Sequence, residues 1–186
     1  LLEIEIPGYP RRGRGKVRDI FTLDEAHILM VASDRLSAFD VVLPTGIPGK
    51  GEVLTAISNH WFEWSAGWLR HQTSERRLED YFDDPLLLDR LRGRSVIAKV
   101  YRPLPIEAVV RGYLAGSGWQ AYRQAGEICG TVLPPGLRLA ERLAEPVFTP
   151  TTKAAPGEHD APMDFDQAVT LLGGEVAEQV RATSVA

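Results

Sequence analysis

The spacing of apolar and polar residues predicts several short strands in the first half of the chain. "KVRDIF" and "HILMVAS" are apolar runs on either side of the turn-like "TLDEA", which predicts two neighbouring strands. "RSVIAKVYR" and "PIEAVVRGY" show the same strand-like composition further along, and the proline-containing "RPLP" joins them. In the segments between and after these runs, the apolar residues recur with a longer period.

That longer period is typical of helices. Helices are predicted over 53–67, 83–93 and 116–126, and a helical pair over 163–184. Ser117 is expected to cap the third helix, and Gly173 with Gly174 to separate the last two. Strands dominate the front of the chain, and helices and loops dominate the back. This order predicts an α+β fold rather than a regular series of βαβ units.

Composition and charge narrow the class of protein. The 186 residues can bury a core as one large domain or two small lobes, and 44% hydrophobic with 25% charged residues is usual for a soluble protein. A net charge of −4 argues against broad nucleic-acid binding. No apolar run approaches the roughly 20 residues of a membrane span, and no signal peptide is recognisable. The single cysteine, Cys129, fits a reducing cytosol, so we expect a cytoplasmic protein.

The segment "FTPTTKAAPGEHD", residues 148–160, has an unusual collection of charged side chains. Two prolines and a glycine make it a poor helix or central strand. Lys153 could offset charge on a phosphoryl group, and Asp160 could accept a proton or bind an ammonium group. His159 is adjacent to Asp160, but neighbours in sequence point in different directions. Taken alone, the segment also fits an exposed polar loop.

A glycine-rich segment precedes the first strand. "GRGKVRD", residues 13–19, combines Gly15 and Lys16, a pairing that lets backbone N–H groups and a cation approach phosphates. It is not a Walker A loop, because Val17 stands where serine or threonine is required. The segment fits a flap over a nucleotide on a strand pair, and it equally fits a basic surface turn.

Further polar residues follow or interrupt apolar strands. Asp34 and Arg35 come directly after "HILMVAS", where they could hold a ligand or form a surface ion pair with each other. Lys99, inside an apolar strand, either reaches solvent or points at a ligand. We interpret the histidines 27, 60 and 71 as structural, and the tryptophans at 61, 64 and 68, which have helical spacing, as core residues.

The strand "IEAVVRG" predicts a polar face. Side chains alternate along a strand, so Glu107 and Arg111 would share one face, as an ion pair or as the lining of a polar cleft. Ser117 follows six residues after Arg111, at a predicted helix start where free N–H groups favour an anion. Arg111 with residues 116–118 therefore predicts a cradle for a phosphate monoester, and Ser117 as a plain helix cap is compatible with it.

Four blocks occur together in an order that resembles one known family. "GKVRDIF", "SDRLSAFDVVLPTGIPGKG", "PIEAVVRGYLAGSGWQAY" and "EPVFTPTTKAAPGEHD" are similar to the SAICAR synthetases of purine biosynthesis, over nearly the whole chain. The resemblance implies an ADP-forming ligase that joins L-aspartate to a carboxyaminoimidazole ribonucleotide, with ATP and Mg²⁺ as cofactors. It also implies a nucleotide-binding lobe over 1–104 and the start of a ribonucleotide and aspartate lobe over 105–186.

The same resemblance implies roles for individual residues. The flap over the ATP phosphates would comprise Gly15, Lys16 and Arg18, and the nucleotide cleft would include Lys99 and Glu107. Arg111 and Ser117 would hold the phosphate of the ribonucleotide, and Asp34 and Arg35 would approach its imidazole carboxylate or the aspartate. The residues expected to face the reacting groups are Lys153, His159 and Asp160.

The chain departs from the family pattern in one respect. The later carboxylate blocks that hold magnesium in this family do not occur here, so the main metal ligands are expected beyond residue 186. The chain also stops directly after a predicted helix, and we expect a truncated or naturally short relative. The alternatives to a ligase are a nucleotide-binding module without turnover and a kinase-like phosphotransferase, against which the blocks around Arg111 and 148–160 argue.

Overall fold

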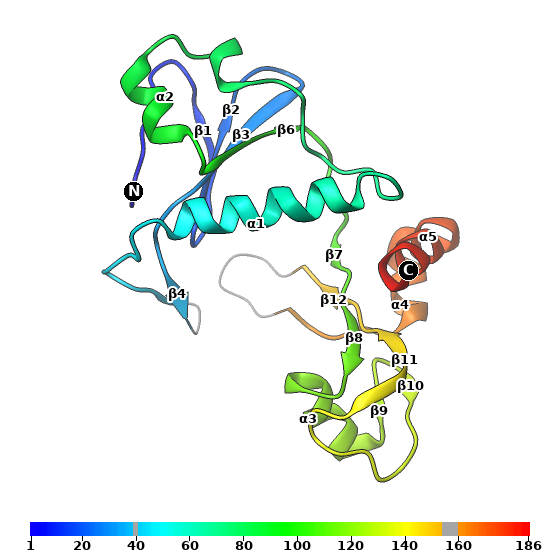
Figure 1. Ribbon diagram of the computed structural model, residues 1–186. Coiled ribbons are helices and arrows are strands. Elements are labelled where there is room, and N and C mark those ends of the chain that lie inside the picture. Colours follow the sequence, from blue (N-terminus) through cyan, green and yellow to red (C-terminus); the bar gives the residue numbers. More distant parts are fainter. Residues whose placement is uncertain (39–40, 154–159) are drawn as a thin grey trace. The chain divides into compact units, whose positions relative to one another are not determined.

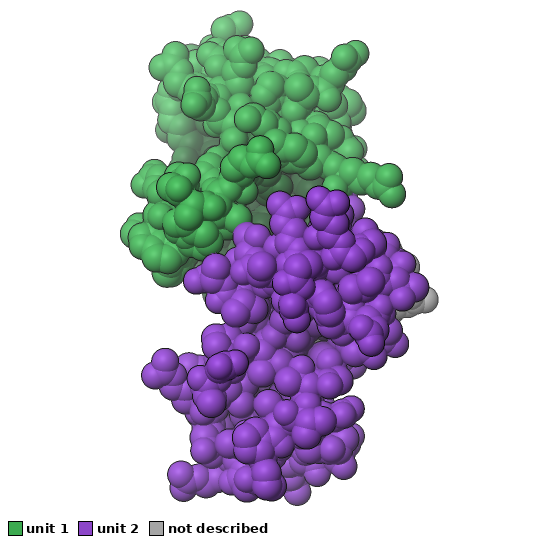
Figure 2. Space-filling view, turned by 90° about the vertical axis from the view of Figure 1, so that its right-hand side faces the viewer, with its two compact units in different colours: residues 1–102 green, residues 103–186 purple. Residues whose placement is uncertain are grey.

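A computed structural model describes residues 1–38, 41–153 and 160–186. The chain divides into two compact units, Leu1–Arg102 and Pro103–Ala186, which Figure 2 distinguishes by colour. Each unit has its own buried apolar residues. Strands and helices occur in both units without a repeating βαβ order, which confirms the predicted α+β class.

Unit 1 is organised around a four-stranded antiparallel sheet with the strand order β1-β2-β3-β6 (Figure 1). The strands are β1 (Arg11–Arg14), β2 (Arg18–Thr22), β3 (His27–Ala32) and β6 (Ser95–Lys99). The predicted pair around "TLDEA" is therefore the β2–β3 hairpin. Phe21 and Leu29 are paired across this hairpin and are fully buried, as the alternation of apolar residues requires.

The other elements of unit 1 connect and flank this sheet. They are the short strands β4 (Ser37–Ala38) and β5 (Val41–Val42), helix α1 (Lys50–Ser65), the 3₁₀ helix η1 (Leu78–Asp80) and helix α2 (Pro85–Leu91). Helix α1 lies against β3 and β6. Helix α2 begins as its sequence predicts, because the Asp84 side chain accepts a hydrogen bond from the Leu86 N–H and Pro85 occupies the first turn.

The core of unit 1 lies between the sheet and the segments that cover it. It consists of Ile4, Ile6, Phe21, Leu29, Val31, Phe82, Leu88, Leu91 and Ile97. These side chains come from the N-terminal segment, from the sheet strands β2, β3 and β6, and from the region of α2. The sheet is therefore packed on one face by segments that are distant in sequence.

Helix α1 corrects one expectation. The tryptophans on this helix and just after it are not core residues, since Trp61, Trp64 and Trp68 are 56%, 62% and 55% exposed. The three rings stack edge to face along the helix surface, with centroid distances of 5.6 and 5.7 Å. The helical spacing groups the tryptophans, but the residues of α1 that are buried are others, such as Thr55.

Unit 2 contains short paired strands. They are β7 (Ile106–Glu107), β8 (Val110–Tyr113), β9 (Glu127–Ile128), β10 (Thr131–Val132), β11 (Arg142–Phe148) and β12 (Thr151–Thr152). The pairs β7–β12, β8–β11 and β9–β10 are all antiparallel. The predicted single strand over "PIEAVVRGY" is wrong, because the chain leaves the ladder at Ala108 and Val109 and forms two strands there. Glu107 and Arg111 therefore do not share one continuous strand face.

The helices of unit 2 are α3 (Gly116–Ala125), α4 (Phe165–Leu172) and α5 (Gly174–Val185). The break between α4 and α5 at Gly173 confirms the predicted helical pair, and Asp164 caps α4 through the Gln167 N–H. Ser117 is not the cap of α3; the cap position is Ala115, and Ser117 is inside the first turn. Among the described residues, no helix has the length and apolar character needed to cross a membrane.

Candidate functional site

The glycine-rich segment forms the tight turn between β1 and β2. Arg14 pairs with Asp19, and residues 15–17 connect the end of β1 to the start of β2. The Gly15 N–H donates to the Arg18 carbonyl at 2.7 Å, and the side chain of Lys16 is exposed. A cation at the tip of a two-stranded ribbon is the geometry predicted for a flap. The role of this turn in binding a nucleotide remains a prediction.

The strand-end residues Asp34 and Arg35 are buried, at 4% and 5% exposure. They do not form a surface ion pair with each other, which was one of the two expectations for them. Arg35 pairs with Asp19 through two hydrogen bonds of 3.0 and 3.1 Å, and Asp34 pairs with Arg94 at 3.1 Å. The two residues therefore connect to different parts of unit 1.

Asp34 anchors the beginning of helix α1. Its carboxylate accepts hydrogen bonds from the Gly51 N–H at 2.9 Å, from Arg94 and from the Leu1 ammonium group. Burial raises the pKa of this carboxyl, but these donors lower it more, to about 2. Gly51 is required here, because a Cβ at that position would be 2.3 Å from the Ala32 carbonyl oxygen. The contact of Asp34 with a substrate stays a prediction.

Arg18 and Lys99 lie at opposite ends of the sheet. Arg18 pairs with Ala32 at the end of β3, whereas Lys99 pairs with His27 at its start. Five residue steps along β3 correspond to about 17 Å at the usual rise per strand residue. Both side chains are exposed. A single ligand that contacts both must therefore be extended along the strands.

Arg111 and Ser117 are brought together at the start of helix α3. The Arg111 Nη2 donates to the Ser117 Oγ at 3.0 Å, and its Nε is buried without a hydrogen-bond partner among the described residues. Gly118 permits this arrangement, because a Cβ there would be 3.1 and 3.2 Å from the Arg111 Cδ and Nε. The guanidinium group thus lies across a helix terminus whose first N–H groups have no intrahelical acceptors.

The residues predicted to face the reaction are found around the β7–β12 pair. Glu107 pairs with Thr151. Thr152 and Ala161 exchange hydrogen bonds of 2.8 and 2.9 Å. Lys153 and Asp160 directly follow and precede this pair, so both are located at the base of the loop. His159 lies outside the described residues.

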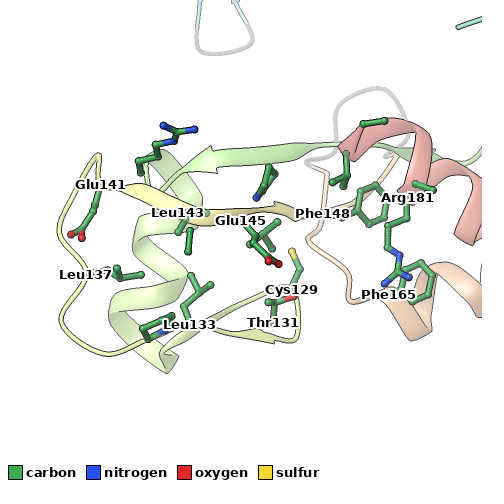
Figure 3. A pocket seen from close by; sticks show the side chains of 18 of the residues that line it. Cys129, Thr131, Leu133, Leu137, Glu141, Leu143, Glu145, Phe148, Phe165 and Arg181 are labelled. Atoms are coloured by element: carbon green, nitrogen blue, oxygen red, sulfur yellow. The ribbon is translucent and has the colours of Figure 1, made fainter. Parts of the chain in front are cut away.

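A large pocket is found elsewhere in unit 2. It has a volume of about 1000 Å³ and is mostly apolar, lined by β11, the segment around β10 and the end of α5 (Figure 3). Cys129 lines it, and burial raises the pKa of this thiol. None of the described residues predicted to bind substrate or nucleotide lines this pocket. Its size alone is no reason to assign the chemistry to it.

A metal site is not formed by the residues that the structure describes. Among them, no group of three or more histidine, cysteine, aspartate or glutamate side chains is placed to hold an ion. These residues therefore form no complete Mg²⁺ site by themselves, and the chemistry below uses only the side chains of this chain.

Three buried residues near the candidate site were not singled out from the sequence. They are Asp19, Ser33 and Arg94, which are 1%, 2% and 7% exposed. The sequence could have indicated that Asp19 is buried. It is two residues before the apolar Phe21, and residues two apart lie on the same face of a strand, here the core-facing side of β2. A carboxylate on an apolar face requires a partner, and that partner is Arg35.

Comparison with known proteins identifies relatives of the whole chain. The family model for SAICAR synthetase matches residues 11–186. The phosphoribosylaminoimidazole-succinocarboxamide synthases of Thioalkalivibrio sulfidiphilus and Methylococcus capsulatus are 50% and 49% identical, each over 100% of this chain. The chain spans 63% and 62% of the length of these two relatives.

Solved structures show the same fold. The SAICAR synthase of Saccharomyces cerevisiae complexed with SAICAR has a TM-score of 0.89 and 34% sequence identity, and the match covers 98% of this chain and 62% of that one. A SAICAR synthetase in complex with ADP has a TM-score of 0.67 and 20% sequence identity, and the match covers 92% of this chain and 64% of that one. The second match shows the fold alone.

Proposed function

The chain belongs to the SAICAR synthetase family, and from that premise we propose that it acts as an ATP-dependent ligase of purine biosynthesis in the cytoplasm. The reaction joins L-aspartate to a carboxyaminoimidazole ribonucleotide and yields SAICAR, ADP and phosphate. The observation that carries the proposal beyond family membership is the contact of Arg111 with Ser117 at the first turn of α3.

This contact suits the phosphate of a ribonucleotide. A guanidinium group presents several N–H donors in a plane, and a serine hydroxyl and helix N–H groups can add further donors to the same anion. The Arg111 Nη2 is at the exposed side of this contact, so the phosphate is proposed to be bound by the Nη N–H groups of the guanidinium. The yeast relative at 34% identity was solved with SAICAR, which is itself a ribonucleotide.

The turn at residues 15–17 is proposed to cover the phosphates of ATP. Lys16 would offset negative charge on these phosphates, with Arg18 close behind it on β2. Lys99, about 17 Å away along the strands, would contact the far end of the nucleotide, and Glu107 is proposed to line the same cleft.

The chemistry requires a carboxylate to become an acylating group. Its oxygen attacks the γ-phosphorus of ATP, the bond to the β-phosphate oxygen breaks, and ADP leaves. The aspartate nitrogen then attacks the carbonyl carbon of the acyl phosphate, the carbon–oxygen bond to the phosphoryl group breaks, and the nitrogen loses a proton. Catalysis of both steps rests on positioning and on cations that offset the charge of the transferred group.

The base of the loop after β12 supplies the groups for these steps. Lys153 is proposed to stabilise the charge on the transferred phosphoryl group, and Asp160 to accept the proton or to hold the ammonium group of aspartate. Asp34 is proposed to approach the imidazole carboxylate or the aspartate. His159 is assigned to the same reacting region on the family resemblance.

ADP release by the chain, measured with each substrate omitted in turn, tests the proposal. We expect ADP to form when ATP, the ribonucleotide and aspartate are all present and to fall to background without the ribonucleotide. ADP release that is independent of the ribonucleotide would indicate a different phosphotransferase. Tight ATP binding without any ADP release would favour a nucleotide-binding module instead of a ligase.

A further inference from the structure

Three consecutive backbone carbonyls of the β1–β2 turn point to one short segment. The Gly15 oxygen accepts a hydrogen bond from the Arg35 Nη2 at 3.1 Å, and the Lys16 oxygen accepts one from the Arg35 Nε at 3.0 Å. The Val17 oxygen accepts two, from the Ser33 N–H and from the Ser33 Oγ, both at 2.9 Å. The conformation of the turn is therefore held by residues 33–35.

The guanidinium group of Arg35 uses all of its donors for this purpose. Besides the two turn carbonyls, it donates to Asp19 Oδ2 and Oδ1 at 3.0 and 3.1 Å, and to the Leu2 carbonyl at 2.7 Å. Arginine has five N–H groups, and these five hydrogen bonds occupy them. With 5% exposure, the side chain has no N–H left to give to a substrate.

Asp19 fixes the plane of this guanidinium group. The carboxylate is 1% exposed and accepts two nearly parallel hydrogen bonds from Nη1 and Nη2. A bidentate pair of this kind sets the orientation of the fork as well as its position. Of the three remaining donors, Nε and the second N–H of Nη2 are then aimed at the Lys16 and Gly15 carbonyls, and the second N–H of Nη1 at the Leu2 carbonyl. A lysine has neither the planar fork nor enough donors to reproduce this arrangement.

We propose that Arg35 is a positioning residue that pre-orders the 15–17 turn for a nucleotide, and not a residue that touches substrate. This inference rests on the proposed function, in which the turn covers the phosphates of ATP. A turn whose carbonyls are already engaged loses less conformational entropy when a ligand binds, so affinity rises without a new contact. It also replaces the expected contact of Arg35 with the imidazole carboxylate or aspartate.

Arg94 offers a matched control within the same unit. It is also a buried arginine, at 7% exposure, and it is ion-paired to Asp34 and Glu52 rather than hydrogen-bonded to the turn. R35K and R94K each remove one buried guanidinium and keep the positive charge. We expect both to lower the thermal unfolding temperature, because both leave buried carboxylates less well paired.

The decisive readout is amide hydrogen exchange of residues 13–18 in the whole chain, with ATP affinity measured by calorimetry. In R35K we expect exchange in this segment to rise about tenfold and ATP affinity to fall about tenfold, as the loss of one or two hydrogen bonds implies. R94K should leave both unchanged. If R35K and R94K show the same amide exchange in residues 13–18 and the same ATP affinity, the positioning role of Arg35 is overturned.

Two further outcomes are distinguishable. If the unchanged chain does not bind ATP, the proposed function fails, while the exchange of residues 13–18 in R35K still decides whether Arg35 orders the turn. If R35K does not fold, S33A removes only the hydroxyl bond to the Val17 oxygen and its weak contact with the Arg35 N–H. Faster amide hydrogen exchange confined to residues 13–18 in S33A would support the inference that residues 33–35 hold the turn. Unchanged exchange in S33A would overturn that inference.

Discussion

Arg111 donates a hydrogen bond of 3.0 Å to the hydroxyl of Ser117, which joins the end of a strand to the first turn of a helix. The two residues are six positions apart, and the chain between them turns from β8 into α3. Gly116, with a φ of 57°, makes this turn possible in a conformation that few other residues adopt. A cationic side chain is thereby held against a helix terminus.

Replacing Arg111 by alanine should weaken ribonucleotide binding much more than ATP binding. Loss of one charge-assisted contact to a phosphate corresponds to about 10- to 100-fold in affinity. Calorimetric titration of the ribonucleotide and of ATP measures both effects. Arg123→Ala is the control, because Arg123 lies near the other end of α3 and stacks on Trp119. Equal losses for both ligands would contradict the cradle.

Gly118→Ala should weaken ribonucleotide binding without unfolding the protein. The added Cβ would be 3.1 Å from the Arg111 Cδ and 3.3 Å from the Ile128 Cδ1, so the arginine must shift. A smaller loss than in Arg111→Ala is expected, since the charge remains. Gly174→Ala, at the start of α5 where a Cβ meets nothing within 4 Å, should be neutral. Affinity in Gly118→Ala equal to that of the unchanged chain would show that the position of Arg111 is unimportant.

Lys16→Ala should chiefly impair the use of ATP. The side chain is exposed at the turn between β1 and β2, so its removal should cost little stability. We expect a roughly tenfold weaker apparent affinity for ATP in steady-state kinetics or calorimetry, with ribonucleotide affinity maintained. Lys50→Ala is the control, because Lys50 also follows a glycine but is the first residue of α1. An unchanged ATP dependence in Lys16→Ala would remove the flap assignment.

Local patterns in the sequence were sufficient for much of unit 1 and for the last two helices. The β2–β3 hairpin follows from apolar runs on either side of a turn, and α2 and α4 follow from Asp84 and Asp164 at their caps. In each case the information lies within a few residues. Such elements can be assigned before any tertiary contact is known.

The holding role of Arg35 could not be obtained in the same way. Its partner Asp19 is sixteen residues earlier, and the contact depends on the register in which Arg18 pairs with Ala32. The tryptophans of α1 illustrate a related limit, because helical spacing shows that side chains share a face but not which face is packed. The division of "PIEAVVRGY" into two strands likewise depends on β11 and β12 as partners.

Trp64→Ala should change stability little, in contrast with a core aromatic. Trp64 is 62% exposed, so we expect a loss of about 1 kcal/mol, mainly from its edge-to-face contacts with Trp61 and Trp68. Phe21→Ala, at 0% exposure, should cost about 3–5 kcal/mol. Denaturant unfolding of both variants checks the contrast. A loss of several kcal/mol for Trp64→Ala would mean that its face of α1 is covered in solution.

The pKa of Asp34 predicts how stability depends on pH at the acid end. Its pKa is lowered from 3.8 to about 2 in the folded chain, although burial alone would raise it, because the Leu1 ammonium, the Gly51 N–H and Arg94 favour the ionised form. A group with a depressed folded pKa contributes stability that is complete above its unfolded pKa and lost as pH falls to its folded pKa. The difference corresponds to about 2 kcal/mol, lost between about pH 4 and pH 2.

Asp34→Asn tests this contribution directly. The variant should be less stable at neutral pH, because asparagine cannot provide the charge that Arg94 faces, and its stability should fall less steeply between pH 4 and pH 2. Asp89→Asn, at an exposed position of α2, should retain the slope of the unchanged chain. Urea unfolding at half-unit pH intervals gives the slopes. If Asp34→Asn and the unchanged chain lose stability in parallel over this range, another carboxylate must be responsible for the acid sensitivity, and the buried pairing of Asp34 with Arg94 would not be its source.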